Sequence, residues 1–229
     1  MTDVHSHILP SVDDGSASVE ESVKLLTMLS EQGVDTVAAT PHFYADYDDL
    51  GSFLKRRLDA YNNLMLNTPA SLPQIRLGAE VAYFDGISYS DAVNELTIEG
   101  TPLLLVEMPM DRWSGRMTEE LLRLASGGNV CVLLAHIERC MPFQKWDGWE
   151  ALLENGVLMQ SNASFFLDRR ARKQAVRLLK DGCIHMLGSD CHNLTMRAPH
   201  LGEAYEAIER YCGREAIERL AMIENDFFR

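Results

Sequence analysis

Residues 2–21, TDVHSHILPSVDDGSASVEE, contain the first two elements of the fold. The run that ends at His5 predicts a short strand buried on both faces. Ser18 is followed three residues later by Glu21, which is a capping box, and Gly33 provides the matching stop signal, so a helix is expected between them. A strand followed directly by a helix is the repeating unit of α/β proteins.

The same alternation continues to the end of the chain. Further strands are expected at residues 36–40, 74–81, 102–107, 130–136, 158–162 and 184–189. The helices are expected at residues 18–32, 50–66, 118–126, 145–154, 169–181, 200–211 and 213–223. No G-x-G-x-x-G turn follows the first strand, which favours a distorted (β/α)7 TIM-like barrel over a dinucleotide-binding sheet. An open parallel sheet would also fit this pattern.

Length and composition limit the possible functions. At 229 residues, with 46% hydrophobic and 24% charged residues, the chain can bury a full core, and a single domain over residues 1–229 is expected. Its net charge of -13 argues against nonspecific binding to nucleic acid or to an anionic membrane. No apolar stretch approaches the roughly 20 residues that span a bilayer, and no signal-peptide pattern is present, so a cytoplasmic location without membrane insertion is expected.

Polar side chains follow the predicted strands at their carboxyl ends, where barrels of this kind build their sites. Those that can ligate a metal ion are His5, His7, Asp14, His42, Glu80, Glu107, His136, Asp190 and His192. Each offers nitrogen or oxygen, and a divalent ion takes four to six such donors, so the set could hold two or three ions. Burying a carboxylate without a partner costs free energy. Chance is also a poor explanation for nine potential ligands at the ends of the predicted strands. The sequence therefore predicts a metal centre suited to manganese, iron or zinc.

The spacing of the histidines supports this prediction. Residues i and i+2 of a strand point to the same side, so His5 and His7 can hold one ion together. Gly188, just before the last pair of candidate ligands, would let the backbone approach closely. His185 and His200 lie outside the pattern, and core or surface roles are expected for them.

At this point the motifs resemble a known family. DVHSHILPSVDDG, TPHF, GAEV, VEMP, AHIER and GSDCHN are similar to the successive motifs of the PHP (polymerase and histidinol phosphatase) superfamily. They resemble in particular the bacterial metal-dependent protein-tyrosine phosphatases linked to capsule and exopolysaccharide synthesis. The resemblance covers essentially the whole chain, and it implies a distorted (β/α)7 barrel with three ions, usually manganese.

The resemblance also implies how the ligands are shared. His5, His7, Glu80 and Asp190 would hold the first ion, Glu80, Glu107 and His136 the second, and Asp14, His42 and His192 the third. Glu80 would then bridge two ions. In the acidic doublet the family pattern favours Asp14 as the ligand, with Asp13 as a helper.

The implied reaction is hydrolysis of phosphotyrosine by a metal-bridging hydroxide, without a protein nucleophile. Arg139, three residues after His136, and Arg197 are the candidates for holding the phosphate, because a guanidinium offers a fork of donors to phosphoryl oxygens. Asp190 or a neighbouring histidine is a candidate for protonating the leaving group. By resemblance, the substrate is a phosphotyrosine protein, namely the tail of a bacterial tyrosine kinase.

Cys191 and Arg197 also have the C-x5-R spacing of the cysteine-dependent phosphatases. The intervening HNLTM contains no glycine, and Asp190 would oppose a thiolate, so thiolate catalysis is not expected. The five cysteines include no C-x-x-C pair, which argues against a disulfide framework or a zinc ribbon.

Two other functions fit parts of the sequence. A small-molecule phosphatase acting on histidinol phosphate, or a nucleotide phosphoesterase, would use the same ions with a different rim. A non-catalytic metal-binding regulatory protein is the alternative outside enzymes. Two segments carry aromatic and cationic side chains that could frame a phosphorylated peptide. They are YADYDDLGSFLKRRLDA, after the second predicted strand, and MPMDRWSGRM, after the fourth.

Overall fold

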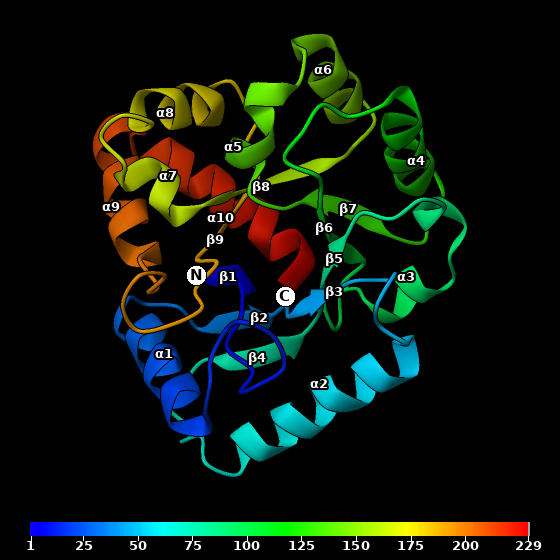
Figure 1. The fold of residues 1–229 in the computed structure, drawn as a ribbon. Helices are drawn as coiled ribbons and strands as arrows, with labels where there is room; N and C mark the ends of the chain where they lie inside the picture. The colour runs from blue at the N-terminus through cyan, green and yellow to red at the C-terminus, as the bar shows by residue number, and fades with distance from the viewer. Residues whose placement is uncertain (229) are drawn as a thin grey trace.

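The structure is a computed structural model that describes residues 1–228. Parallel strands curl around a central axis, and the helices cover the outside of the sheet (Figure 1). This confirms a mixed α/β fold built on a curled parallel sheet, in which buried strands alternate with amphipathic helices.

The strands form two hydrogen-bonded sheets. The first sheet has the order β1 (Thr2–Ser6), β2 (Thr36–Ala39) and β4 (Gln74–Leu77). The second has the order β3 (His42–Phe43), β5 (Glu80–Ala82), β6 (Leu103–Glu107), β7 (Cys131–Leu134), β8 (Leu158–Asn162) and β9 (Met186–Gly188). The segment after β9 returns to β1, where the Asp190 amide donates to the His5 carbonyl at 2.8 Å and the His7 amide to the Cys191 carbonyl at 2.9 Å.

One expected strand is interrupted, and one further short strand is present. The predicted strand 74–81 is divided into β4 and β5 at residues 78 and 79, and β3 was not expected from the sequence. Pro41 separates β2 from β3, because a proline has no amide hydrogen for the ladder. The chain keeps its direction across both breaks, since the Gly78 amide donates to Ala39 at 2.9 Å and the Glu80 amide to Pro41 at 3.1 Å.

Each expected helix is present. They are α1 (Val19–Glu31), α2 (Leu50–Met65), α4 (Gly115–Ser126), α6 (Trp146–Glu154), α8 (Arg172–Lys180), α9 (Leu201–Cys212) and α10 (Arg214–Phe228). The short helices η1 (Ile87–Tyr89), α3 (Ala92–Glu95), α5 (Ile137–Cys140), η2 (Met141–Phe143) and α7 (Ala163–Leu167) lie in connections and were not expected. The Ser18 hydroxyl caps α1 by accepting from the Glu21 amide at 3.2 Å, which confirms the predicted start.

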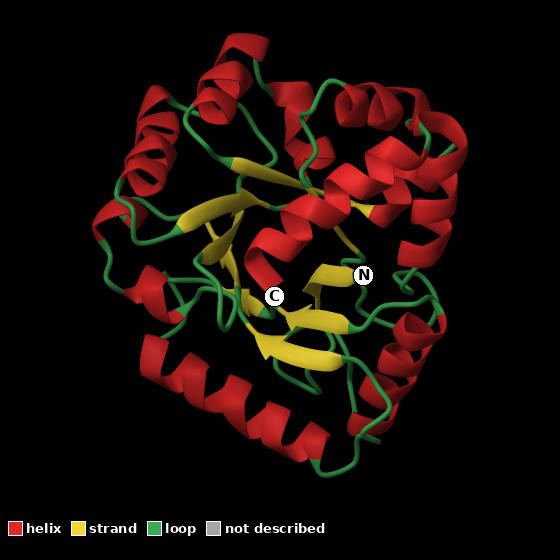
Figure 2. Ribbon diagram, turned by 180° about the vertical axis from the view of Figure 1, so that it is seen from behind, coloured by secondary structure: helices red, strands yellow, loops and turns green. Residues whose placement is uncertain are grey.

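The core lies on both sides of the sheet. Most buried apolar residues fill the space between the sheet and the outer helices, while a smaller cluster including Val4, Leu105 and Met186 lies inside the curl. Phe227 and Phe228 of α10 pack against this inner cluster. In Figure 2, which is seen from behind, α10 crosses in front of the strands, so the amino ends of the strands are covered and the carboxyl ends are left for the site.

Two candidate ligands have unusual backbone conformations. His136 has a φ of 29° and Asp190 a φ of 52°, and Ser11 is the other non-glycine residue with a positive φ within residues 1–228. Such conformations cost energy for residues with a Cβ and persist only where the surroundings enforce them. The predicted strand 130–136 therefore ends early, at Leu134, and His136 turns toward the axis as the N-cap of α5.

None of the helices within residues 1–228 is both long enough and apolar enough to cross a membrane.

Candidate metal centre

Glu80 lies at the middle of the predicted ligands and is 1% exposed. Its Oε2 lies 3.1 Å from His5 Nε2, 3.2 Å from His7 Nε2 and 3.1 Å from His42 Nδ1. Its Oε1 lies 2.8 Å from His136 Nε2. One carboxylate thus faces four imidazole rings from the ends of three strands, β1, β3 and β7, which is the position of a group shared between neighbouring ions.

Two further carboxylates face the same rings. Asp190 Oδ1 lies 3.6 Å from the Nε2 atoms of His5 and His7 and 3.6 Å from His192 Nδ1. Glu107 Oε1 lies 3.4 Å from His136 Nε2. The structure therefore brings the acids and the histidines of the strand ends into one cluster.

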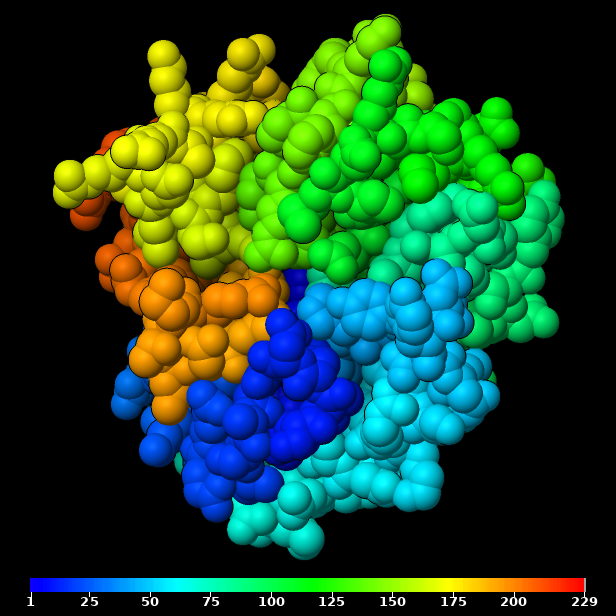
Figure 3. Space-filling model, viewed as in Figure 1, coloured from blue at the N-terminus to red at the C-terminus, as the bar shows by residue number. Residues whose placement is uncertain are grey.

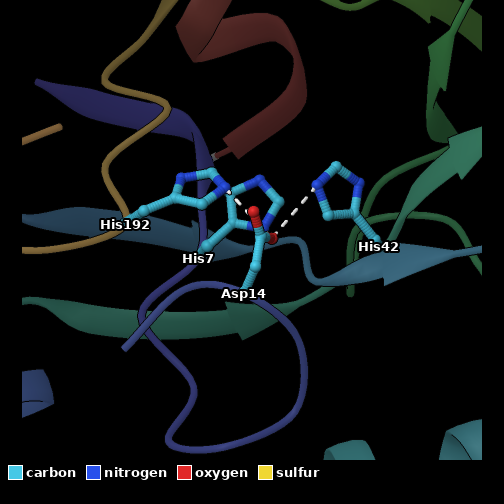
Figure 4. A group of neighbouring side chains, drawn as sticks. All are labelled: His7, Asp14, His42 and His192. Atoms are coloured by element: carbon cyan, nitrogen blue, oxygen red, sulfur yellow. Dashed lines mark ion pairs between the residues drawn. The ribbon is translucent and has the colours of Figure 1, made fainter. Parts of the chain in front are cut away.

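Asp14 completes the cluster from the loop after β1. Its Oδ1 lies 3.5 Å from both His42 Nε2 and His192 Nε2, and Figure 4 shows the rings of His7, His42 and His192 gathered around this carboxylate. Asp14 is 68% exposed, so the cluster opens to solvent on this side. In Figure 3 the deep-blue N-terminal segment is visible here at the bottom of a hollow between the orange, green and light-blue segments.

The donor set fits divalent cations. Ligand atoms lie within 4.8 Å of one another in three groups: His7, Asp14, His42 and His192; His5, His7 and Asp190; and His42, Glu80 and Glu107. His42 Nδ1, His192 Nε2 and Glu80 Oε2 are buried but make no hydrogen bond with residues 1–228. Leaving such atoms without partners costs free energy, so their convergence on shared points is explained by cations placed between them.

Asp13 and Asp14 have different positions, although they are adjacent. Asp13 lies behind His7, where its Oδ2 is 2.6 Å from His7 Nδ1 and accepts from the His42 amide at 3.0 Å. This contact holds His7 with Nε2 directed into the cluster, as carboxylates behind metal-binding histidines do. Burial alone would raise the pKa of Asp13, but the interaction with His7 outweighs it and lowers the pKa to about 2.

Gln160 of β8 orients His5 in the same way, and sequence reasoning missed it. Its Oε1 accepts from the His136 amide at 2.7 Å and lies 3.1 Å from His5 Nδ1. Because the backbone amide can only donate, this oxygen is an acceptor, and His5 must carry its hydrogen on Nδ1 and leave Nε2 free for a cation. The Gln160 amide nitrogen donates at 2.9 Å to Asn162, whose own amide nitrogen donates at 2.8 Å to Asp190.

Arg139 and Arg197 lie on either side of Asp190. Arg197 Nη2 donates to Asp190 Oδ1 at 2.7 Å, and Arg139 Nη2 donates to Asp190 Oδ2. Both guanidinium groups are about one-third exposed, at 33% and 35%, so some of their donors reach the open side of the cluster. Burial would raise the pKa of Asp190, but His5 and Arg139 outweigh it and hold the pKa well below its ordinary value.

Two glycines let the backbone pack tightly behind the histidines. A Cβ on Gly188 would lie 2.5 Å from the Cβ of His5, and one on Gly15 would lie 2.5 Å from the Cβ of His7. The close approach expected at Gly188 is therefore confirmed, while that at Gly15 was not expected.

The remaining histidines lie outside the cluster, as expected. His185 is largely buried, and its Nδ1 accepts from the Met159 amide at 3.1 Å. His200 precedes α9, is 45% exposed, and lies 2.8 Å from Glu203.

Cys191 is fully buried beneath the cluster, with 0% exposure. Burial and the nearby Asp3 and Asp190 raise the pKa of its thiol, which is the opposite of what an attacking thiolate requires. We therefore expect Cys191→Ser to keep phosphatase activity within about twofold of the unchanged protein. Assay with an aryl phosphate checks this, and near-total loss in a folded, metal-loaded variant would contradict the metal-centre interpretation.

The sequence is similar to those of a family of known proteins. A sequence model of the family described as capsular polysaccharide synthesis, CpsB/CapC, matches residues 1–226. The chain is 30% identical over 246 residues to the tyrosine-protein phosphatase CpsB of Streptococcus agalactiae, which covers 98% of this chain and 96% of that protein. It is 27% identical over 222 residues to the tyrosine-protein phosphatase YwqE of Bacillus subtilis, which covers 94% of this chain and 86% of that protein.

Solved structures share the fold. A crystal structure from the pair YwqE of Bacillus subtilis and CpsB of Streptococcus pneumoniae, described as unique metal-dependent tyrosine phosphatases, has a TM-score of 0.84 at 22% identity and covers 99% of this chain and 95% of that one. Histidinol phosphate phosphatase of Lactococcus lactis, with zinc, L-histidinol and phosphate, has a TM-score of 0.57 at 12% identity and covers 94% of this chain and 93% of that one.

Proposed function

Because this chain belongs to the CpsB/CapC family of capsular polysaccharide synthesis, we propose that it is a metal-dependent phosphotyrosine-protein phosphatase. The observation that carries the proposal is the cluster of histidines and acids around Glu80, with Arg139 and Arg197 at its open edge. Relatives that span nearly the whole chain are named tyrosine-protein phosphatases.

In this proposal three groups of residues hold divalent ions, with manganese preferred and iron or zinc as alternatives. The ligands are those expected from the sequence, namely His5, His7, Asp14, His42, Glu80, Glu107, His136, Asp190 and His192. When bound, such ions neutralise phosphate charge and make water a better nucleophile at neutral pH. The short contacts of Glu80 with four rings support its role as the shared ligand.

The protein side chains have separate tasks. Arg139 and Arg197 hold and orient the phosphoryl oxygens with the guanidinium donors that Asp190 leaves free. Asp13 and Gln160 fix the orientation of His7 and His5. The lowered pKa of Asp190 in the metal-free protein favours a ligand role for this residue over a proton-donor role. A phenol is a good leaving group, so a strong acid is not needed there.

The proposal also includes the barrel, the single domain, the location and the substrate that were expected from the sequence. The bridge between Ser6 and Cys191 supports a seven-stranded, distorted barrel, in which β2 with β3 and β4 with β5 each count as one bent strand. We propose one domain over residues 1–229, a cytoplasmic location, and a substrate in the tail of a bacterial tyrosine kinase.

The test is a parallel measurement of kcat/KM for three substrates by the manganese-loaded protein. We expect a phosphotyrosine peptide to be preferred over histidinol phosphate and over a dinucleotide by at least about tenfold. Preference for histidinol phosphate or the dinucleotide would favour the small-molecule alternative. Absence of hydrolysis of all three would favour the non-catalytic one.

A further inference from the structure

A strongly basic segment lies on the face that carries the metal centre. Residues 169–180 contain six of the chain's 21 basic residues and none of its 34 acidic residues, although the whole chain has a net charge of -13. The segment forms the turn after α7 and then α8, which lies at the edge of this face in Figure 1 and is yellow in Figure 3.

The charges at the start of α8 do not stabilise the helix, whereas Arg177 and Lys180 lie in its last turn, where cations are favourable. Arg172 and Lys173 occupy the first turn of α8, which contains no acidic residue, and cations are unfavourable at the positive end of the helix dipole. Lys173 and Arg177 are four residues apart, where like charges repel each other. Helix stability therefore does not explain the cations at the amino-terminal end of the segment.

Most of these side chains are free to meet a partner. Two of them already have partners: Arg172 donates to the Phe166 and Leu167 carbonyls at 2.8 and 2.9 Å, and Arg177 Nε lies 3.4 Å from Asp181 Oδ2. Arg169, Arg170 and Lys173 are exposed and make no ion pair with any residue in the described part of the chain.

A groove connects this basic segment to the metal centre. It has a volume of about 410 Å³ and is lined by Glu138, Arg139, Asn162, Ser164, Phe165, Asp168, Ala171 and Gln174. Arg139 and Asn162 contact Asp190 at one end of the groove, and Ala171 and Gln174 belong to the basic segment at the other. A chain held by Arg139 through its phosphate could therefore continue along the groove past the exposed Arg170 and Lys173.

The groove itself carries two acids, Glu138 and Asp168, so the positive charge lies in the basic segment at its end. From this arrangement we propose that the basic segment, reached along the groove, binds acidic residues that flank the phosphotyrosine of the substrate. The inference rests on the proposed phosphatase function, and it names the sequence class of peptide that the site prefers. Opposite charges at the rim of an interface act mainly on encounter and selection, and their effect weakens as salt screens them.

The test compares three substrates: a phosphotyrosine peptide with three flanking acids, the same peptide with the matching amides, and free phosphotyrosine. The manganese-loaded protein is expected to hydrolyse the acidic peptide with a kcat/KM about tenfold above that of the amide peptide at low ionic strength. The ratio should fall toward one as salt is raised.

The test variant is Arg169→Glu/Arg170→Glu/Lys173→Glu, which places an acid in the first turn of α8 and so suits the helix dipole. It should lose the preference for the acidic peptide and hydrolyse free phosphotyrosine as before. The control variant, Lys24→Glu/Lys55→Glu/Arg214→Glu, reverses three exposed charges on α1, α2 and α10 and should keep the preference.

The outcomes separate the two proposals. If free phosphotyrosine is hydrolysed but wild type shows no preference for the acidic peptide, or both variants lose it equally, the groove proposal is wrong and the phosphatase function stands. If none of the three substrates is hydrolysed, the phosphatase function itself fails. Binding of wild type to phosphatidylglycerol vesicles that only the test variant loses, with peptide preference unchanged, would assign the segment to a membrane surface instead.

Discussion

Replacing Glu80 with glutamine is expected to lower kcat/KM for an aryl phosphate by about a thousandfold, which corresponds to about 4 kcal/mol of lost transition-state stabilisation. Glutamine has nearly the same shape as glutamate but lacks the negative charge. Its amide nitrogen replaces one carboxylate oxygen, and this nitrogen is a hydrogen-bond donor that cannot ligate a cation. Four imidazole nitrogens lie within 3.2 Å of this carboxylate, so its loss affects every part of the cluster. Metal content and activity should fall together.

Two matched variants show whether the loss is specific. Glu120 is also a buried glutamate, at 4% exposure, but it accepts from Gly86 and Arg116 away from the cluster, so Glu120→Gln should keep the metal and the activity. Gln160→Met removes the contact that orients His5 without removing a ligand, and a loss of metal affinity of about 10 to 100-fold is expected. Full metal content and activity in Glu80→Gln would overturn the assignment of Glu80 as the shared ligand.

The convergence of these residues could be predicted from the sequence because they follow strand ends. The carboxyl ends of parallel strands meet at one edge, so residues far apart in the chain, such as His5, Glu80 and His136, were expected to converge without knowledge of the exact strand bounds. The position of Glu80 shows how robust this reasoning is. The residue was expected near the end of a continuous strand, yet it begins β5 after a break, and it still faces the same rings.

Other parts of the site could not be read from the sequence, because they depend on contacts between distant segments. Gln160 lies inside a predicted strand and carries no motif, and only the folded positions of His5 and the His136 amide show its function. Asp13 and Asp14 have the same chemistry, and the path of the loop alone decides which one reaches the open side. The positive φ of His136 and Asp190 is likewise imposed by the surrounding structure.

Removal of metal ions with a chelator is expected to abolish phosphotyrosine hydrolysis reversibly and to change how stability depends on pH. Burial would lower the pKa of His7 and His136, but hydrogen bonds with Asp13 and Glu80 for His7, and with Glu107 and Glu80 for His136, outweigh it in the metal-free protein. The pKa values rise from 6.5 to about 10 for His7 and about 9 for His136.

The sign of the pH effect follows from these shifts. A group whose pKa is higher in the folded state stabilises that state fully below its unfolded pKa and loses the contribution as pH rises through the folded value. The metal-free protein should therefore lose stability as pH is raised from about 7 to about 10. Bound ions have the opposite effect because they require neutral histidines, and saturation at a hundred times Kd adds about 2.7 kcal/mol per site.

Thermal unfolding of the metal-free and manganese-loaded protein between pH 6 and pH 9 checks this, and the gap between the two melting temperatures should widen as pH rises. His7→Asn should flatten the pH dependence of the metal-free form, because the buried partner of Asp13 and Glu80 is gone. His200→Asn, which changes an exposed histidine beside Glu203, should leave the dependence as it is. A metal-free protein that becomes more stable toward pH 9, or one that retains activity without metal, would show that the cluster is not held together as described.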